Sequence, residues 1–414
     1  MRDSNRSPTI PARDERRGFL EAELRARTRE WIQAIVNEEL DEALGSERYG
    51  RAEERLGYRK GRRARTFTTR NGCHRIDFPR GYFFAADAEG KKEWNSQLVP
   101  RYARRTDEVE DAILLSYLCG ANSRRIKIAL APLLQGAALA RSTISRIVKR
   151  LGTEYERWRE RDWSAADIAL LILDGFNLKM RLAHRVESVP VLAVLGIRPD
   201  GRKVLLALEL RTCESTAAWQ SLTERLCQQG VTRPVLAIID GNGGLHNAVK
   251  TTWPWIEVQR CAVHKLQNLY THAPKRHHEE LKADYHAIVY AASEKKARLA
   301  WARFEEKWEK SCPGLVASLR EAGEELLTFF RYPKMMWKCL RTTNAIERMN
   351  EEFRRRVKTQ GSFPDAHAGP RLLFGLIASG QIRLRRIDGS KQLSRVLDVK
   401  RKQLGLVKTV DKAA

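Results

Sequence analysis

The sequence predicts an α/β protein in which a mixed β-sheet core with an all-helical insertion follows a mainly helical N-terminal region. Two observations carry this prediction. Short apolar runs cluster between residues 166 and 260, whereas the segments on either side space their apolar residues at helical intervals. The longest apolar runs have the length of a strand and fall far short of the roughly 20 residues of a membrane helix.

The first hundred residues predict an arm, a helical segment and a basic hairpin. Residues 1–17 are charged and poor in apolar side chains, so we expect a mobile arm there, followed by an N-terminal region over 18–106. Residues 66–78 alternate around Asn71-Gly72, as in a hairpin, after a basic stretch at 55–65. One or two amphipathic helices are expected from apolar residues at roughly helical intervals: Leu20, Leu24, Trp31, Ile35, Leu40 and Leu44.

Residues 107–160 predict a helical, helix-turn-helix-like region. Helices are expected at Val109–Tyr117, at Ser123–Leu134 and from Ser142 onward. In a helix-turn-helix motif the last helix enters the major groove. The residues that it would present to DNA are Ser142, Thr143, Arg146 and Lys149. The alternative is a linker bundle with a solvated basic face.

From residue 166 the sequence predicts strands. Three come in quick succession and should form an antiparallel meander, and they are followed by helix, strand, helix and strand. The expected strands are Ile168–Leu173, Val189–Ile197, Arg202–Leu210, Val235–Ile239 and Trp255–Val258, with helices at Ser215–Gln228 and near 245–251. This order matches a ribonuclease-H-like core.

The core is expected to occupy residues 165–365, with a helical insertion at about 270–335 and a C-terminal helical tail at 366–414. Trp301, Phe304 and Trp308 fall on one helix face of the insertion. We interpret them as its hydrophobic core rather than as a platform on which bases stack.

Three carboxylates stand where a divalent-cation site could form. Asp174 follows the first apolar run, Asp240 follows the fourth, and Glu347 begins a basic helix. Acids held still by a rigid scaffold supply the oxygen ligands that hard cations require. The apolar stripe of the basic helix (Ile346, Met349, Phe353 and Val357) should pack on the sheet and leave Glu347 at its flank. From spacing alone, Glu351 and Glu352 remain alternatives to Glu347.

Two nearby motifs allow more than one interpretation. Residues 241–244 contain three glycines, but His246 stands where a dinucleotide fingerprint needs its last glycine, so we favour close approach of a DNA backbone. Cys261 and His264 supply two zinc ligands, whereas structural zinc sites take four. They form a polar pair beside the active site, a buried Cys with a hydrogen-bonded His, or a zinc site that recruits His272, His277 and His278; we favour the first two.

Composition favours a polyanionic partner. Lys plus Arg number 76 against 51 Asp plus Glu, a net charge of +25. Such a charge suits nucleic acid, although a generally basic protein or one that binds anionic lipid has the same balance. The basic residues predicted to contact DNA outside the helix-turn-helix-like region are Arg59, Lys60, Arg62, Arg63, Arg65, Lys179, Arg181, Arg354, Arg355 and Arg356.

The cysteine content and the N-terminus predict the compartment. The seven cysteines are scattered and odd in number, which suggests no disulfide framework and fits a reducing cytosol. The N-terminus has no apolar signal core. We therefore expect a cytoplasmic, nucleoid-associated protein that does not bind membranes.

Four segments in this order resemble the mutator-type transposases of bacterial insertion sequences. They are residues 174–181, 239–245, 259–268 and 341–348, and Gly57-Tyr-Arg-Lys-Gly61 also looks like the family's N-terminal motif. The resemblance implies a catalytic, metal-binding Asp-Asp-Glu (DDE) triad of Asp174, Asp240 and Glu347 on a ribonuclease-H-like fold, and so favours Glu347 over Glu351. The residues that it places around this triad are Cys261, His264, Asn344 and Arg348.

The same resemblance implies a function. The protein would bind the terminal inverted repeats of an insertion sequence and target DNA as a homodimer or higher oligomer. It would use two Mg²⁺ ions, or Mn²⁺, to cut a strand with water and join the freed 3′-OH to the target. Two departures, Asn177 and Lys60, stand where the family usually has an aromatic residue and Asn. The rival interpretations are a DNA-binding regulator with an inactive core and a nuclease or Holliday-junction resolvase.

Overall fold

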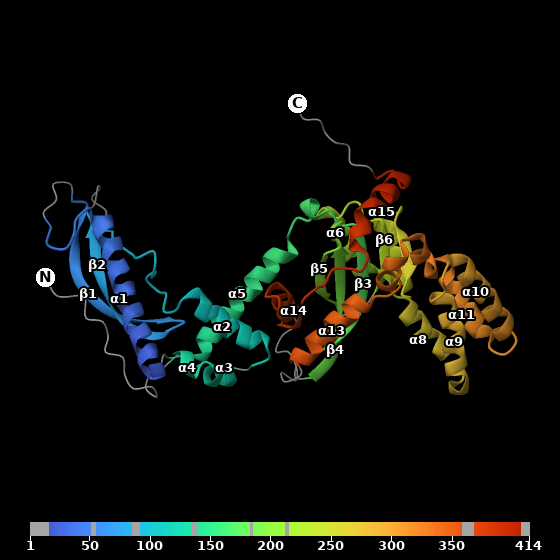
Figure 1. Ribbon diagram of the computed structural model, residues 1–414, viewed down its shortest axis with the longest axis horizontal. Helices are drawn as coiled ribbons and strands as arrows, with labels where there is room; N and C mark the ends of the chain where they lie inside the picture. Colours follow the sequence, from blue (N-terminus) through green and yellow to red (C-terminus); the bar gives the residue numbers. More distant parts are fainter. Residues whose placement is uncertain are drawn as a thin grey trace, which may run out of the picture. The chain divides into compact units, whose positions relative to one another are not determined.

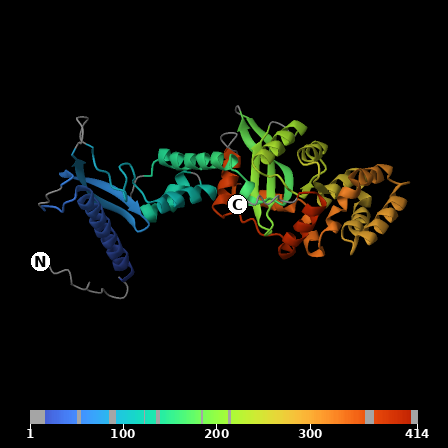
Figure 2. The ribbon, with the colours of Figure 1, turned by 90° about the horizontal axis from the view of Figure 1, so that it is seen from above.

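The computed structural model describes residues 16–50, 55–84, 92–121, 123–134, 139–182, 185–211, 215–357 and 368–406. The chain divides into two compact units, Met1–Arg150 and Leu151–Ala414, each shown in Figures 1 and 2. The boundary falls inside helix α5 (Arg141–Arg159). The predicted arm at 1–17 lies outside the described residues except for its last two, which begin helix α1.

The first unit opens with helix α1 (Arg16–Leu44) and a long hairpin of β1 (Gly57–Thr69) and β2 (Gly72–Phe83). The strands pair antiparallel down to Thr69 and Gly72, so the predicted hairpin around Asn71-Gly72 is confirmed. Register shifts between Arg59 and Arg62, where Gly61 adopts a left-handed φ of 71°, the conformation that a bulge of this kind requires. One face of α1 packs on the hairpin and encloses a small core.

The predicted apolar stripe of α1 is wrong for its first four members. Leu20, Leu24, Trp31 and Ile35 are exposed, Trp31 by 67%. The residues of α1 that pack against the hairpin are Ile32 and Val36, together with the predicted Leu40 and Leu44. A single helix satisfies both spacings because it carries apolar residues on two faces, and periodicity alone does not tell which face is covered.

The second part of this unit is a helical bundle with its own buried cluster, which includes Val109, Ile126 and Ile147. It consists of α2 (Asp107–Leu118), α3 (Ser123–Ala129), α4 (Ala131–Leu134) and the start of α5. The predicted second helix is therefore interrupted at residue 130. Helices form at all three places where the helix-turn-helix-like region was expected: α2 at the first, the pair α3 and α4 at the second, and α5 at the third.

The second unit is built on a five-stranded mixed sheet with the order β5-β4-β3-β6-β7 (Figure 1). The first three strands pair antiparallel, whereas β3–β6 and β6–β7 pair parallel, which confirms the predicted meander and the helix–strand alternation. The elements are β3 (Leu170–Leu182), β4 (Arg185–Ile197), β5 (Lys203–Leu210), α6 (Thr216–Gln228), β6 (Leu236–Ile239), α7 (Gly243–Thr252) and β7 (Glu257–Arg260).

The two faces of the sheet have different covers. Leu171 and Leu173 of β3 share a buried cluster with Trp219 of α6 and Leu245 of α7. Because side chains alternate along a strand, residues 172 and 174 point to the other face. There α13 (Asn344–Val357) contacts β3, and its residues Ile346, Met349 and Phe353 are buried, as the stripe predicts; α14 (Ala368–Ala378) contacts β5.

A helical insertion separates β7 from α13. It begins at residue 262, earlier than predicted, and comprises α8 (Ala262–Thr271), α9 (His278–Val289), α10 (Glu294–Trp308), α11 (Pro313–Ala322) and α12 (Trp337–Leu340) with short 3₁₀ turns. Phe304 and Trp308 are buried, so their interpretation as core is confirmed. In the described part of the chain no helix is both long and apolar enough to cross a bilayer.

The C-terminal helix α15 (Ser390–Gln403) is tied to the sheet by ion pairs. Lys400 Nζ lies 2.8 and 2.9 Å from the two carboxylate oxygens of Glu257 on β7. Arg401 contacts both oxygens of Asp167, at 2.8 and 3.0 Å. Leu393 and Leu397 are buried beside these pairs, so the segment is part of the folded unit.

We predict that Glu257→Ala destabilises the second unit by roughly 1–3 kcal/mol, because it leaves the largely buried Lys400 ammonium without its partner. Urea unfolding followed by tryptophan fluorescence measures the change. Glu309→Ala, which breaks an exposed pair with Arg320, is the control and should cost less than about 0.5 kcal/mol. Equal effects of the two substitutions would show that α15 does not depend on this contact.

Candidate active site

The first two predicted acids lie at the same level of neighbouring parallel strands. Ile172 of β3 is in register with Ile238 of β6, and each acid follows two residues later. Parallel strands lie about 4.8 Å apart, so Asp174 and Asp240 are neighbours. Asp240 directly follows the end of β6, as predicted, and one of its carboxylate oxygens accepts a hydrogen bond from the Asn242 backbone N–H at 3.0 Å.

Asp174 differs from its prediction in one respect. It lies inside β3, paired opposite Ala193, rather than past the end of the strand, and it is 6% exposed. The strand continues to Leu182 because β4 supplies a partner along its whole length. Burial raises the pKa of the Asp174 carboxyl to about 7, although the positive charge of His264 lowers it; the negative charges of Asp240 and Glu347 add to the increase. His264, Asp240 and Glu347 are therefore all close enough to Asp174 to change its pKa.

Glu347 reaches this face from the first turn of α13. The fully buried Thr343 precedes that helix, and its hydroxyl lies 3.5 Å from a Glu347 carboxylate oxygen and 3.4 Å from both Cys261 Sγ and His264 Nδ1. The Thr343 backbone N–H also donates to Cys261 Sγ at 3.4 Å. Thr343 thus links the Cys-x-x-His pair to the glutamate. It was not predicted, although it lies within the Arg-Thr-Thr-Asn segment that carries the resemblance.

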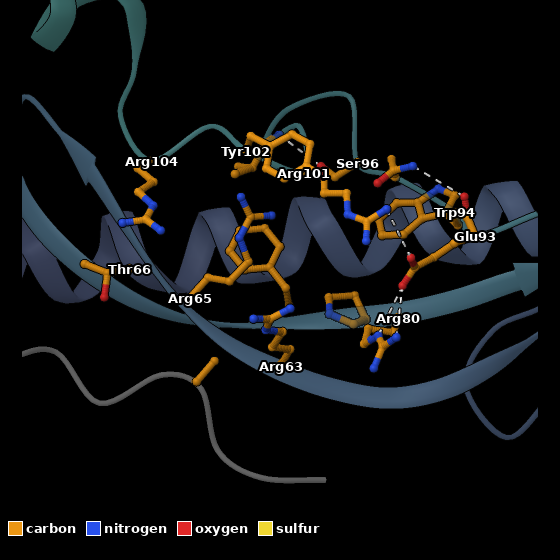
Figure 3. A pocket seen from close by; sticks show the side chains of 15 residues that line it. Arg63, Arg65, Thr66, Arg80, Glu93, Trp94, Ser96, Arg101, Tyr102 and Arg104 are labelled. Atoms are coloured by element: carbon orange, nitrogen blue, oxygen red, sulfur yellow. Dashed lines mark hydrogen bonds and ion pairs between the residues drawn. The ribbon is translucent and has the colours of Figure 1, made fainter. Parts of the chain in front are cut away.

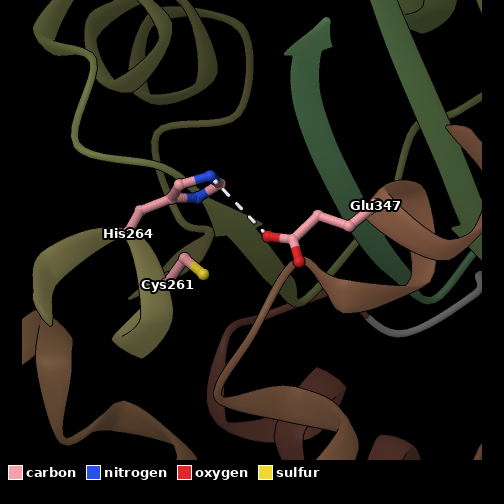
Figure 4. A group of neighbouring side chains, drawn as sticks. All are labelled: Cys261, His264 and Glu347. Atoms are coloured by element: carbon pink, nitrogen blue, oxygen red, sulfur yellow. Dashed lines mark ion pairs between the residues drawn. The ribbon is translucent and has the colours of Figure 1, made fainter. Parts of the chain in front are cut away.

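Cys261, His264 and Glu347 form a compact group at the end of the sheet. Their ligand atoms all lie within 4.8 Å of one another, and Figure 4 shows the imidazole facing the carboxylate, with His264 Nε2 3.7 Å from Glu347 Oε1. A hydrogen bond with the thiol of Cys261 raises the pKa of His264 to about 9, together with the nearby acids and against the effect of burial. Burial alone would raise the pKa of Cys261, but the interactions with His264 outweigh it and lower the pKa.

Main-chain bonds hold the segments of this group together. The Cys261 N–H donates to Ile239 O at 2.7 Å, beside the end of β6, and the Ala262 N–H donates to Arg341 O at 2.8 Å. The start of α8 is therefore fixed both to the strand that leads to Asp240 and to the segment that leads to Glu347. Neither contact could be read from the distance along the chain.

The donor set suits a divalent cation. Three carboxylates could supply hard oxygen ligands, and the charges of Asp240 and Glu347 both act on the buried Asp174. Of the three, Glu347 belongs to the compact group with Cys261 and His264, whereas Asp174 and Asp240 lie outside that group. The side-chain oxygen of Asn344, in the first turn of α13, is buried and has no hydrogen-bond partner within the described segments. His272, His277 and His278, the other predicted zinc candidates, are not in the compact group with Cys261 among the described residues.

The predicted DNA contacts fall into two groups. Arg59 is ion-paired with Asp41, Arg65 donates to the Pro100 and Ala103 carbonyls, and Arg355 and Arg356 pair with Glu352. The members that are largely exposed are Lys60, Arg62, Arg63, Ser142, Arg146, Lys149, Lys179, Arg354 and the paired Arg355. Arg348, which the resemblance places beside the triad, is exposed as well. Thr143 is half-buried, and the side chain of Arg181 lies outside the described residues.

A protein-family model settles the family. The model described as "Transposase, Mutator family" matches residues 12–382. The chain belongs to the mutator family of transposases. This family assignment confirms the resemblance drawn from the four sequence segments.

Relatives of the mutator-family chain are transposases of bacterial insertion sequences. The transposase for element ISRM5 of Rhizobium meliloti (strain 1021) is 34% identical over 353 residues, covering 85% of this chain and 86% of its own. The transposase for IS6120 of Mycolicibacterium smegmatis is 35% identical, covering 68% and 86%. Among solved structures, a Drosophila P element transposase strand transfer complex matches with a TM-score of 0.30 and 12% identity, over 74% of this chain and 87% of that one.

We predict that Asp174→Asn stabilises the cation-free protein at pH 8. The folded pKa of about 7 lies above the unfolded value of about 3.9, so stability falls as pH rises from 4 to 7 and the loss persists above it. Asparagine removes this loss, worth roughly 2–4 kcal/mol.

Urea unfolding in a chelator at pH 5 and pH 8 measures the effect, with the exposed Asp200→Asn as a control that should follow the wild-type profile. A variant that is less stable than wild type at pH 8 would contradict the burial argument.

Proposed function

We propose that the protein is a DNA transposase that cuts and joins strands by a DDE mechanism, with Asp174, Asp240 and Glu347 as its carboxylates. The observation that carries the proposal is geometric. Two acids stand at one level of adjacent parallel strands, on the face of the sheet that is contacted by the helix bearing the third. The strand order, with three antiparallel strands followed by two parallel ones, supports a ribonuclease-H-like core.

The three carboxylates would hold divalent cations, two Mg²⁺ ions in our proposal, with Mn²⁺ as a substitute. Such cations, when bound, activate an attacking oxygen and stabilise a leaving one. The role of the protein is to position the three carboxylate ligands and to limit the repulsion between their negative charges. Asp174 must ionise despite its burial, Asp240 is held by the Asn242 N–H, and Glu347 is held by Thr343 and His264. All three act as ligands, so no acid has to donate a proton.

The proposed reaction has two in-line phosphoryl transfers. In the first, a water oxygen bonds to phosphorus at the end of the element and the bond to the 3′-oxygen breaks, which frees a 3′-OH. In the second, this 3′-OH attacks a phosphodiester of the target and the target's own 3′-oxygen leaves. Each step exchanges one P–O bond for another and moves one proton, so no oxidant or reductant is needed.

We infer that the N-terminal unit recognises the terminal inverted repeats. Its α5 carries exposed Ser142, Arg146 and Lys149 on a bundle with its own core, an arrangement that suits insertion into a major groove. The net charge of +25 supports a DNA partner. Bringing two ends together implies at least a dimer on DNA.

Strand cleavage and joining in Mg²⁺ tests the function directly. The substrate is a duplex with the terminal sequence that flanks this gene, and the variants are Asp240→Asn and the exposed control Asp200→Asn. We expect wild type and the control to yield joined products, and Asp240→Asn to lose more than about 100-fold of the rate, since it removes a ligand rather than a supporting residue.

The other outcomes separate the rival functions. End binding without cleavage by any of these proteins would point to a regulator. Cleavage without end preference or joining would point to a nuclease. Equal activity of wild type and Asp240→Asn would overturn the assignment of the acids.

We also predict that Thr343 positions Glu347. Thr343→Val keeps the shape of the side chain but removes the hydroxyl, and should weaken both cation binding and strand transfer by about 10–100-fold, as is typical of residues that orient a ligand. Thr343→Ser restores the hydroxyl and should recover most of the loss. The readout is the Mn²⁺ concentration that gives half-maximal thermal stabilisation. A Ser variant as weak as the Val variant would show that the methyl group matters instead.

A further inference from the structure

A hollow of about 580 Å³ in the N-terminal unit is lined by five arginines. It lies between the β1–β2 hairpin and the segment of residues 93–104, and Figure 3 shows the guanidinium groups around it. The five arginines of this groove, which we call the arginine groove, are Arg63, Arg65, Arg80, Arg101 and Arg104. Three of them, Arg80, Arg101 and Arg104, were absent from the residues predicted from the sequence to contact DNA.

The walls of the arginine groove are fixed by the fold. The Thr68 N–H donates to Arg104 O and the Trp94 N–H to Gly81 O, both at 2.9 Å, so residues 94 and 104 are bound to opposite strands of the hairpin. The guanidinium of Arg65 stacks on Phe78 at 4.6 Å and donates to the Pro100 and Ala103 carbonyls. Arg65 is therefore a structural part of the groove.

The positive charge of the groove is only partly balanced. Among the described residues that line it, Glu93 is the acidic one, and it pairs with Arg80 at 3.1 Å and Arg101 at 3.6 Å. Arg63 and Arg104 are exposed and form no ion pair with any residue that the structure describes. Burial, and then the charges of these two arginines, lower the pKa of Arg65, so the three guanidiniums repel one another. A bound anion would relieve this repulsion.

We propose that the arginine groove holds the sugar–phosphate backbone of one strand of the DNA end, without reading its sequence. This inference rests on the proposed function. Guanidinium groups bind phosphate with two parallel hydrogen bonds, and Tyr102, which is 84% exposed at the rim, offers a flat ring beside them. A hollow of about 580 Å³ is too small to enclose a duplex, so it would take a stretch of the backbone of one strand. The groove thus complements α5, which carries the candidates for base reading.

The double variant Arg63→Gln/Arg104→Gln tests the proposal, because both side chains lack protein partners in the described structure and should leave the fold intact. Fluorescence anisotropy would measure its affinity for a terminal-end duplex and for a scrambled duplex over a series of NaCl concentrations. We expect both affinities to fall by the same factor and the slope of log K against log salt to decrease by about 2, since each phosphate contact contributes about 0.9.

The matched control is Arg27→Gln/Arg298→Gln, which removes two arginines that already have acidic partners, one on α1 and one in the helical insertion. Its salt slope should stay at the wild-type value. An unchanged slope in the groove variant would overturn the proposal and leave an acidic protein segment as the partner. Loss of preference for the terminal duplex would also overturn it, because the groove would then read bases.

The same samples separate this proposal from the proposed function. If the groove variant behaves as expected while the wild-type protein neither cuts nor joins DNA, the proposal for the arginine groove is supported and the proposed transposase mechanism is contradicted. If strand transfer occurs while the salt slope of the groove variant is unchanged, the proposed mechanism is supported and the proposal for the arginine groove is contradicted.

Discussion

The parallel pairing of β3 with β6 is the contact on which the candidate active site depends. Its register sets Ile172 beside Ile238 and so brings Asp174 level with Asp240. The alternation of side chains then turns Asp174 away from the cluster under α6 and α7 and toward α13. A slip of one residue would turn it into that cluster instead. The register thus decides which helices each face meets: α6 and α7 pack on the apolar cluster, and α13 contacts β3 on the face of Asp174.

A buried carboxylate beside two others is costly, and the molecule offsets this cost with polar partners. Burial raises the pKa of Asp174 to about 7, the direction that such a cost requires. Thr343, Cys261 and His264 surround Glu347 and supply hydrogen-bond donors and positive charge. Their position follows from two main-chain bonds that fasten the start of α8 to Ile239 and to Arg341. Stability is thus given up where cations are proposed to bind, a common feature of catalytic sites.

The order of strands and helices in the second unit could be predicted from the sequence, because apolar runs such as Val235–Ile239 have the length of a buried strand, contain β-branched residues and end at polar or turn residues. The covered face of α1 could not, since Trp31 and Ile32 both fit a helical stripe and only the hairpin decides between them. The length of β3 was underestimated because its second half depends on pairing with β4. Contacts such as that of Thr343 with Cys261, or the arginine groove itself, join residues whose approach is set by tertiary structure.

The most direct test of the central claim, that Asp174, Asp240 and Glu347 converge on divalent cations, is a crystal structure of the full chain with Mn²⁺, in which anomalous scattering locates the ion. We predict a peak within coordination distance of Asp174 and Asp240, with the carboxylate of Glu347 turned toward it. A peak bound only by Cys261 and His264, or the absence of any peak near Asp174 at saturating Mn²⁺, would contradict the account.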